Sequence, residues 1–178
     1  MTSLELLDSA RHKLAIARWH GAELQRVLDD YVPDDLDDPR RLALEGHLEG
    51  IAYMGTAAAE KTIRSLAPLT LTDQGNLPTM IRLAKNLPEP GARDFATQFE
   101  TWWMQRGRPT RYAQAARDLR NDAAHSAYEK TAEGVGWCMR IRNQREGIEL
   151  TEFARGYLAE LGELDVLVAE ADELAAVE

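Results

Sequence analysis

The chain has 178 residues, 44% of them hydrophobic and 29% charged, so one domain can bury a core without disulfides or structural metals. Its one cysteine, Cys138, excludes an internal disulfide and fits a reducing cytoplasm, and no apolar run approaches a signal-peptide core or the ~20 residues of a membrane span. The net charge of -9 argues against a protein that coats nucleic acid with its whole surface. We therefore expect a cytoplasmic protein with a single domain over residues 1–178.

Two long helices are expected first. Two rows of apolar and small residues recur every seven positions across residues 3–31, which predicts a helix that faces a core. The rows are Leu7, Leu14, Gly21 and Leu28, and Ala10, Ala17, Leu24 and Tyr31. Asp38 followed by Pro39 is typical of a helix N-terminus, so a second helix is predicted from there to about residue 66. These helices are expected to form an antiparallel hairpin, and another helix is expected to cross the second one at its glycines, which are Gly46, Gly50 and Gly55.

Shorter elements should follow Pro68 and a loop over residues 69–76. Helices are predicted after Pro78, over 93–105 and over 110–130, the second with Trp102 and Trp103 as buried anchors in preference to base-stacking platforms. Alternating residues in 137–142 predict a strand that pairs with 148–150, and a last helix should begin at about residue 151. The predicted fold class is an all-α bundle with two long N-terminal helices and a small β-hairpin before the last helix.

Charge is distributed unevenly along the chain. Residues 101–145 contain nine basic and four acidic side chains, a net charge of +5, so the remainder carries -14. A basic segment on an acidic body is typical of a local anion-binding site, although chance clustering also produces one.

The predicted helix 110–130 lies in this basic segment and differs from the others in composition. Spacings of four, four and three residues place Arg117, Asn121, His125 and Tyr128 on one face, and Arg120 flanks that row. Histidine titrates near neutral pH, so His125 can take a proton from a ribose 2′-hydroxyl or give one to the departing 5′-oxygen. Arginine can brace phosphate oxygens as negative charge develops, and Asn121 can orient the imidazole. This set indicates RNA cleavage without a metal or cofactor.

The segment RNDAAH, Arg120 to His125, resembles the motif of the HEPN superfamily, in which an arginine, a polar residue and a histidine lie in a late helix of an all-α bundle. The resemblance implies a metal-independent endoribonuclease, with Arg120 and His125 catalytic and Asn121 supporting them. It also implies a homodimer with a composite site, a toxin or antiphage role, and a possible antitoxin or regulatory protein as partner. In the toxins of this superfamily that pair with a nucleotidyltransferase, a tyrosine usually stands two residues after the histidine. Here Ala127 holds that position and Tyr128 follows it.

Two other interpretations remain open. The same helix can belong to a non-catalytic module that binds RNA, a nucleotide or a protein partner, or the motif can be accidental in a structural protein. Arg117 and Tyr128 are candidate substrate-binding residues, with pairing to an acidic neighbour and packing at an interface as their alternatives. Arg140 and Arg142 either follow an RNA backbone or keep an edge strand soluble.

No metal site is expected. His12, His20 and His47 have no evident partners, Glu-x-x-His is absent from the sequence, and the pair Asp122 and His125 lacks further ligands at helical spacing. Cys138 is expected to be a buried structural thiol.

Overall fold

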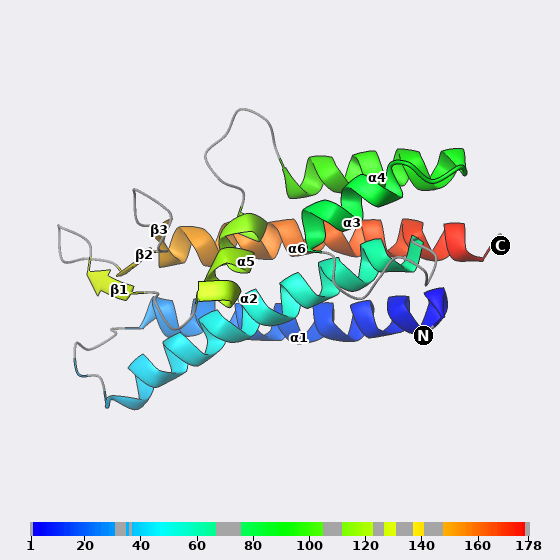
Figure 1. Ribbon diagram of the computed structural model, residues 1–178. Helices are drawn as coiled ribbons and strands as arrows, with labels where there is room; N and C mark the ends of the chain where they lie inside the picture. Colours follow the sequence, from blue (N-terminus) through cyan, green and yellow to red (C-terminus); the bar gives the residue numbers. More distant parts are fainter. Residues whose placement is uncertain are drawn as a thin grey trace.

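The computed structural model describes residues 2–30, 35, 37–66, 76–104, 112–122, 127–130, 137–140 and 148–176, the side chains of 121–140 excepted. The chain is predominantly helical, as predicted. In chain order the elements are α1 (Ser3–Asp29), α2 (Pro39–Leu66), α3 (Leu77–Ala84), α4 (Pro90–Trp103), α5 (Tyr112–Asp122), β1 (Ala127–Lys130), β2 (Trp137–Arg140), β3 (Ile148–Glu149) and α6 (Leu150–Ala175). Figure 1 shows α1, α2 and α6 side by side, with the strands at one end of the bundle and both chain termini at the other.

The α1/α2 hairpin follows the predicted pattern. The side chain of Thr2 accepts a hydrogen bond from the backbone of Glu5, whose carboxylate accepts one from the backbone of Thr2, which fixes the start of α1. Asp38 accepts the backbone N–H of Arg40 at the start of α2. The six predicted core positions of α1 from Leu7 to Leu24 are all buried. The heptad pattern therefore identified the face that packs on α2 and α6.

The glycines of α2 mark close crossings at two positions and not at a third. An added Cβ at Gly50 would lie 2.5 Å from the ring of His20 on α1, and one at Gly55 would overlap the hydroxyl of Tyr157 on α6. An added Cβ at Gly46 would meet nothing within 4 Å. The expected close approach is confirmed at Gly50 and Gly55 and is wrong at Gly46.

Helix α6 lies at the centre of the bundle, in contact with α1, α2, α4 and α5. The described helices all contribute to one hydrophobic cluster, whose largest fully buried side chains include Trp103, Tyr157, Phe99 and Phe153. Trp102 and Trp103 are core anchors, as predicted, and the indole of Trp102 donates to the backbone carbonyl of Glu160 on α6. Helix α4 begins at Pro90, earlier than predicted, because proline is tolerated in the first turn of a helix.

The β region differs from the sequence-based expectation. Strand β2 pairs antiparallel with β3, which confirms the predicted hairpin, but β2 also pairs with β1 on its other side. The predicted helix to residue 130 is therefore wrong, since α5 ends at Asp122 and Ala127–Lys130 form a strand. Asn121 and Asp122 have low helix propensity, which favours the end of α5 there. Backbone groups of β2 form hydrogen bonds with β1, and they would lose these bonds if residues 127–130 continued the helix. Among the described residues, no helix is long and apolar enough to cross a membrane.

Candidate functional site

Helix α5 carries the basic half of the predicted motif and packs between α2 and α6. Ala113, Ala116 and Leu119 are buried on its apolar face. Because alanine side chains are small, the backbone of α5 approaches its neighbours closely, and the arginines at its edge lie against residues of α2 and α4. The surroundings of α5 therefore determine what those arginines can do.

The N-terminal end of α5 is bound by a carboxylate from α6. Glu160, only 8% exposed, accepts the backbone N–H groups of Tyr112 at 3.2 Å and Ala113 at 2.7 Å. The first N–H groups of a helix point out of its end, and Glu160 accepts these two as a capping side chain does. Nearby, the Tyr112 hydroxyl donates to Glu152 at 2.5 Å. The start of α5 is therefore fixed by α6.

The C-terminal end of α5 holds Arg120, the candidate catalytic arginine. Its Nη2 donates to Oε1 of Glu60 on α2 at 2.9 Å, and the two side chains are 21% and 25% exposed. Close to this ion pair lies Tyr157, which is fully buried and shares a side-chain hydrogen bond with Thr56. Burial is the main cause that raises the pKa of Tyr157, which Arg120 lowers slightly by its charge. Arg120 is therefore oriented by α2 at the edge of the core.

Arg117, a candidate substrate-binding residue, has protein partners too. Its guanidinium lies 5.4 Å from the ring centroid of Trp103 and is bonded to the carboxylate of Asp118, its neighbour in sequence. The alternative that Arg117 pairs with an acidic neighbour is confirmed. The Trp103 contact adds a cation–π interaction that joins α5 to α4.

Several of the predicted site residues are described in part or not at all. His125 and Arg142 lie outside the described residues. Asn121 lies in the last turn of α5, but its side chain is outside the described part. The side chain of Cys138, in β2, is outside it as well, so the predicted burial of this thiol stays a prediction.

Two further predicted site residues lie in the sheet. Tyr128 is in β1 opposite Met139, and Arg140 is in β2 opposite Ala127. Because β1 is a strand and not the end of a helix, Tyr128 does not share a helical face with Arg117. This placement corrects the predicted four-residue row.

Two residues that hold the motif helix, Glu60 and Glu160, were missed by the sequence reasoning. Each lies far along the chain from its partner, at separations of 60 residues for Arg120 and 47 for Ala113. No local spacing signals a contact of that kind. Both carboxylates stand on amphipathic helices, where an acidic residue is ordinarily a solvated one.

A second polar cluster lies on the α1/α2 hairpin. Nδ1 of His20 and Nδ1 of His47 are 3.1 Å apart, although neither residue had an evident partner in the sequence. Desolvation, followed by the charge of His47, lowers the pKa of His20. In the described part of the chain, no group of three or more His, Cys, Asp or Glu residues is placed to hold a metal ion.

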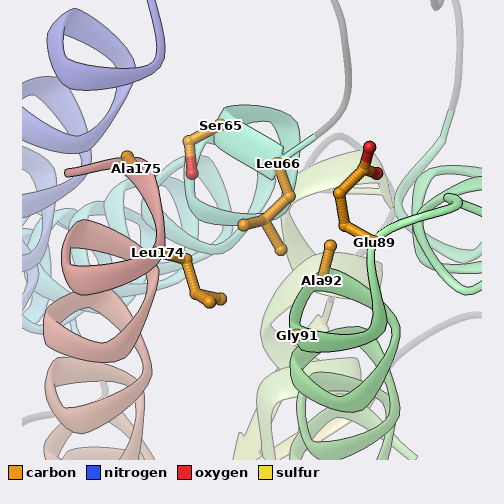
Figure 2. A pocket seen from close by; sticks show the side chains of 7 residues that line it. All are labelled: Ser65, Leu66, Glu89, Gly91, Ala92, Leu174 and Ala175. Carbon is orange, nitrogen blue, oxygen red and sulfur yellow. The ribbon is translucent and has the colours of Figure 1, made fainter. Parts of the chain in front are cut away.

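A small cavity of about 200 Å³ lies where the C-terminal ends of α2 and α6 meet the start of α4. Figure 2 shows Leu66 and Leu174 directed into this space, with Ser65 and Glu89 at its margin. The Ser65 hydroxyl donates to the carbonyl of Thr62, so it is engaged within its own helix. The described lining holds no histidine, lysine or arginine, and the cavity is smaller than typical ligand sites of roughly 300–1,000 Å³. It offers no chemistry comparable to that of α5.

Comparisons with known proteins give no match to a family model, a curated protein or a solved structure. The function is therefore argued from the residues of α5 and their partners.

Proposed function

We propose that this chain is a metal-independent endoribonuclease in which Arg120 and His125 act on the scissile phosphodiester. The observation that carries the proposal is the placement of Arg120, whose guanidinium is fixed by Glu60 at the end of the helix that leads into residues 123–126. A fixed cation is what stabilises developing negative charge without reorganising during the reaction. His125 follows five positions later in the sequence.

The reaction needs only groups that the motif supplies. An imidazole takes the proton of the 2′-hydroxyl, the 2′-oxygen attacks phosphorus, and the bond to the 5′-oxygen breaks as that oxygen receives a proton. The products are a 2′,3′-cyclic phosphate and a 5′-hydroxyl end. In a homodimer with a composite site, as the HEPN resemblance implies, two copies of His125 supply the base and the acid. The supporting and RNA-binding residues of the proposal are Asn121, Arg117, Tyr128, Arg140 and Arg142.

The biological setting belongs to the same proposal and depends on the resemblance alone. It is that of a cytoplasmic toxin or antiphage effector, with an antitoxin or another regulatory protein restraining cleavage.

The test is cleavage of mixed cellular RNA in EDTA by the wild type, His125→Ala and Arg120→Lys, followed by mapping of the new ends. We expect cyclic-phosphate ends from the wild type and a loss of about 10²–10⁴-fold in His125→Ala, the range for a general acid or base. Arg120→Lys keeps a cation for Glu60 but loses the planar fork that grips phosphate, so cleavage should fall while the melting temperature changes little.

His12→Gln is the matched control, because His12 is an exposed histidine on α1 and its loss should leave cleavage unchanged. Cleavage by His125→Ala at the wild-type rate would refute the assignment of that residue. Strong inhibition by EDTA would refute the metal-independent mechanism.

A second candidate is a non-catalytic module that binds RNA through this region. The acidic partners of Arg117 and Arg120 lower the positive charge that either can present to a transition state, which counts against catalysis, and they lower the attraction to phosphate as well. For such a module, labelled RNA should bind and be released intact by wild type and His125→Ala alike, with affinity that falls as salt rises.

A further inference from the structure

The α1/α2 hairpin brings two imidazoles together far from the motif helix in sequence. His20 extends from α1 and His47 from α2, with their Nδ1 atoms 3.1 Å apart and both rings half-buried. The ring of His20 lies directly over Gly50, where an added Cβ would be 2.5 Å from it. The pair therefore depends on a close helix crossing that only glycine permits.

The spacing of the two nitrogens matches the bite of a bidentate metal site. Bonds of about 2.0–2.1 Å from each nitrogen to one ion would subtend about 100° at the metal, between the ideal square-planar and tetrahedral values. The ion would lie beside the line that joins the nitrogens, so binding requires the rings to turn toward it. It would replace the proton that the two nitrogens share in the hydrogen-bonded pair.

The ligand type of the pair suits a transition-metal cation. Imidazole nitrogen is a preferred ligand of Zn²⁺, Ni²⁺ and Cu²⁺. Both histidines belong to the part of the chain outside residues 101–145, which carries a net charge of -14.

We propose that His20 and His47 form a surface site for one borderline divalent transition-metal ion, with water completing the coordination. Water is required because the described residues place no third His, Cys, Asp or Glu beside the pair. This site is independent of the proposed ribonuclease centre, which needs no metal.

Trp19 provides a direct reporter of the site. Its ring makes edge contacts with both imidazoles, at centroid distances of 4.8 Å to His20 and 5.5 Å to His47, and it is 56% exposed. A paramagnetic ion held by the pair should quench its fluorescence. Trp19→Phe should abolish that change and leave metal binding measured by calorimetry intact.

The experiment is titration of the full chain with Ni²⁺ at pH 7.5, followed by calorimetry and tryptophan fluorescence. We expect one ion per chain, a rise in melting temperature, and affinity that falls at least tenfold, or about 1.4 kcal/mol, in His20→Gln and in His47→Gln. Gly50→Ala is the sharpest variant, because it retains both ligands but displaces the His20 ring. It should weaken binding as strongly, while circular dichroism shows the helices to be intact.

His12→Gln and Gly46→Ala are the matched controls, one an exposed histidine of α1 and the other an α2 glycine with open space around it. Both should bind Ni²⁺ like the wild type. Absence of binding, or binding that survives in His20→Gln and His47→Gln, would overturn the site. Binding of one ion by two chains would show that a second chain, and not water, completes the coordination of the ion.

Discussion

The two ends of α5 are held by carboxylates that bind different kinds of group. At the N-terminal end, nearly buried Glu160 binds backbone N–H groups, a contact that would serve whatever side chains stood at those positions. At the C-terminal end, Glu60 binds the side chain of Arg120, and both partners stay about one quarter exposed. One contact fixes the start of a helix and the other fixes an arginine side chain.

Under the proposed function, this difference separates stability from catalysis along a single helix. A buried, charge-assisted hydrogen bond to backbone contributes strongly to stability, whereas a partly exposed ion pair contributes about 0–1 kcal/mol. The ion pair between Glu60 and Arg120 therefore contributes little to stability, and its main effect is to orient the guanidinium of Arg120. Substitutions at the two ends should have opposite profiles, with large stability effects at Glu160 and mainly functional effects at Glu60.

The largest effect is expected from Glu160→Gln. The amide keeps one acceptor oxygen but directs an NH₂ group at N–H donors of α5, so the capping interaction is lost in part. We expect the free energy of unfolding to fall by about 2 kcal/mol, measured by urea denaturation. Glu173→Gln, an exposed change on the same helix, should stay within about 0.5 kcal/mol of the wild type. Equal effects of the two substitutions would contradict the capping role.

Tyr157, which packs in the core close to Arg120, should make the protein sensitive to alkali. Its folded-state pKa is raised mainly by burial, so above the ordinary value of about 10 the unfolded chain loses this proton first. The folded state then binds more protons than the unfolded state, and stability falls as pH rises, by up to about 1.4 kcal/mol per pH unit. Below pH 10 this contribution is fully present.

The measurement is urea denaturation between pH 8 and pH 11. Tyr157→Phe should flatten the alkaline decline, although it also loses the hydrogen bond to Thr56 at neutral pH, so the slopes are compared. Tyr53→Phe is the matched control, because Tyr53 is 56% exposed and its loss should leave the wild-type slope. An unchanged slope in Tyr157→Phe would show that another group controls alkaline unfolding.

Local patterns predicted the helices, because heptad spacing and capping residues are short-range signals. Leu7 to Leu24 and Asp38 are examples, and both assignments are confirmed. The glycines of α2 show the limit of such reasoning. A sequence reveals that glycine is present, but only the fold decides that Gly55 faces Tyr157 while Gly46 faces open space.

The candidate site was predictable only in part. Spacing placed Arg117 and Arg120 on the correct helix, yet Tyr128 is in a strand because β2 offers pairing that competes with helix formation. Long-range partners are set by how helices pack and not by any local pattern. They are Glu60, Glu160, and the contact between His20 and His47.

The smallest stability effect, and the one most informative about function, is expected from the pair Glu60 and Arg120. In a double-mutant cycle with Glu60→Gln and Arg120→Gln, the coupling in the free energy of unfolding should be about 0.5–1 kcal/mol. Cleavage of RNA is the second readout. If Glu60 is a positioning residue, Glu60→Gln lowers kcat more than this stability change explains, and its RNA affinity stays close to that of the wild type. If the pair is only structural, both single variants lose stability equally and Glu60→Gln cleaves normally. That second result would leave Glu60 as a residue that only stabilises the contact between α2 and α5, with no part in cleavage.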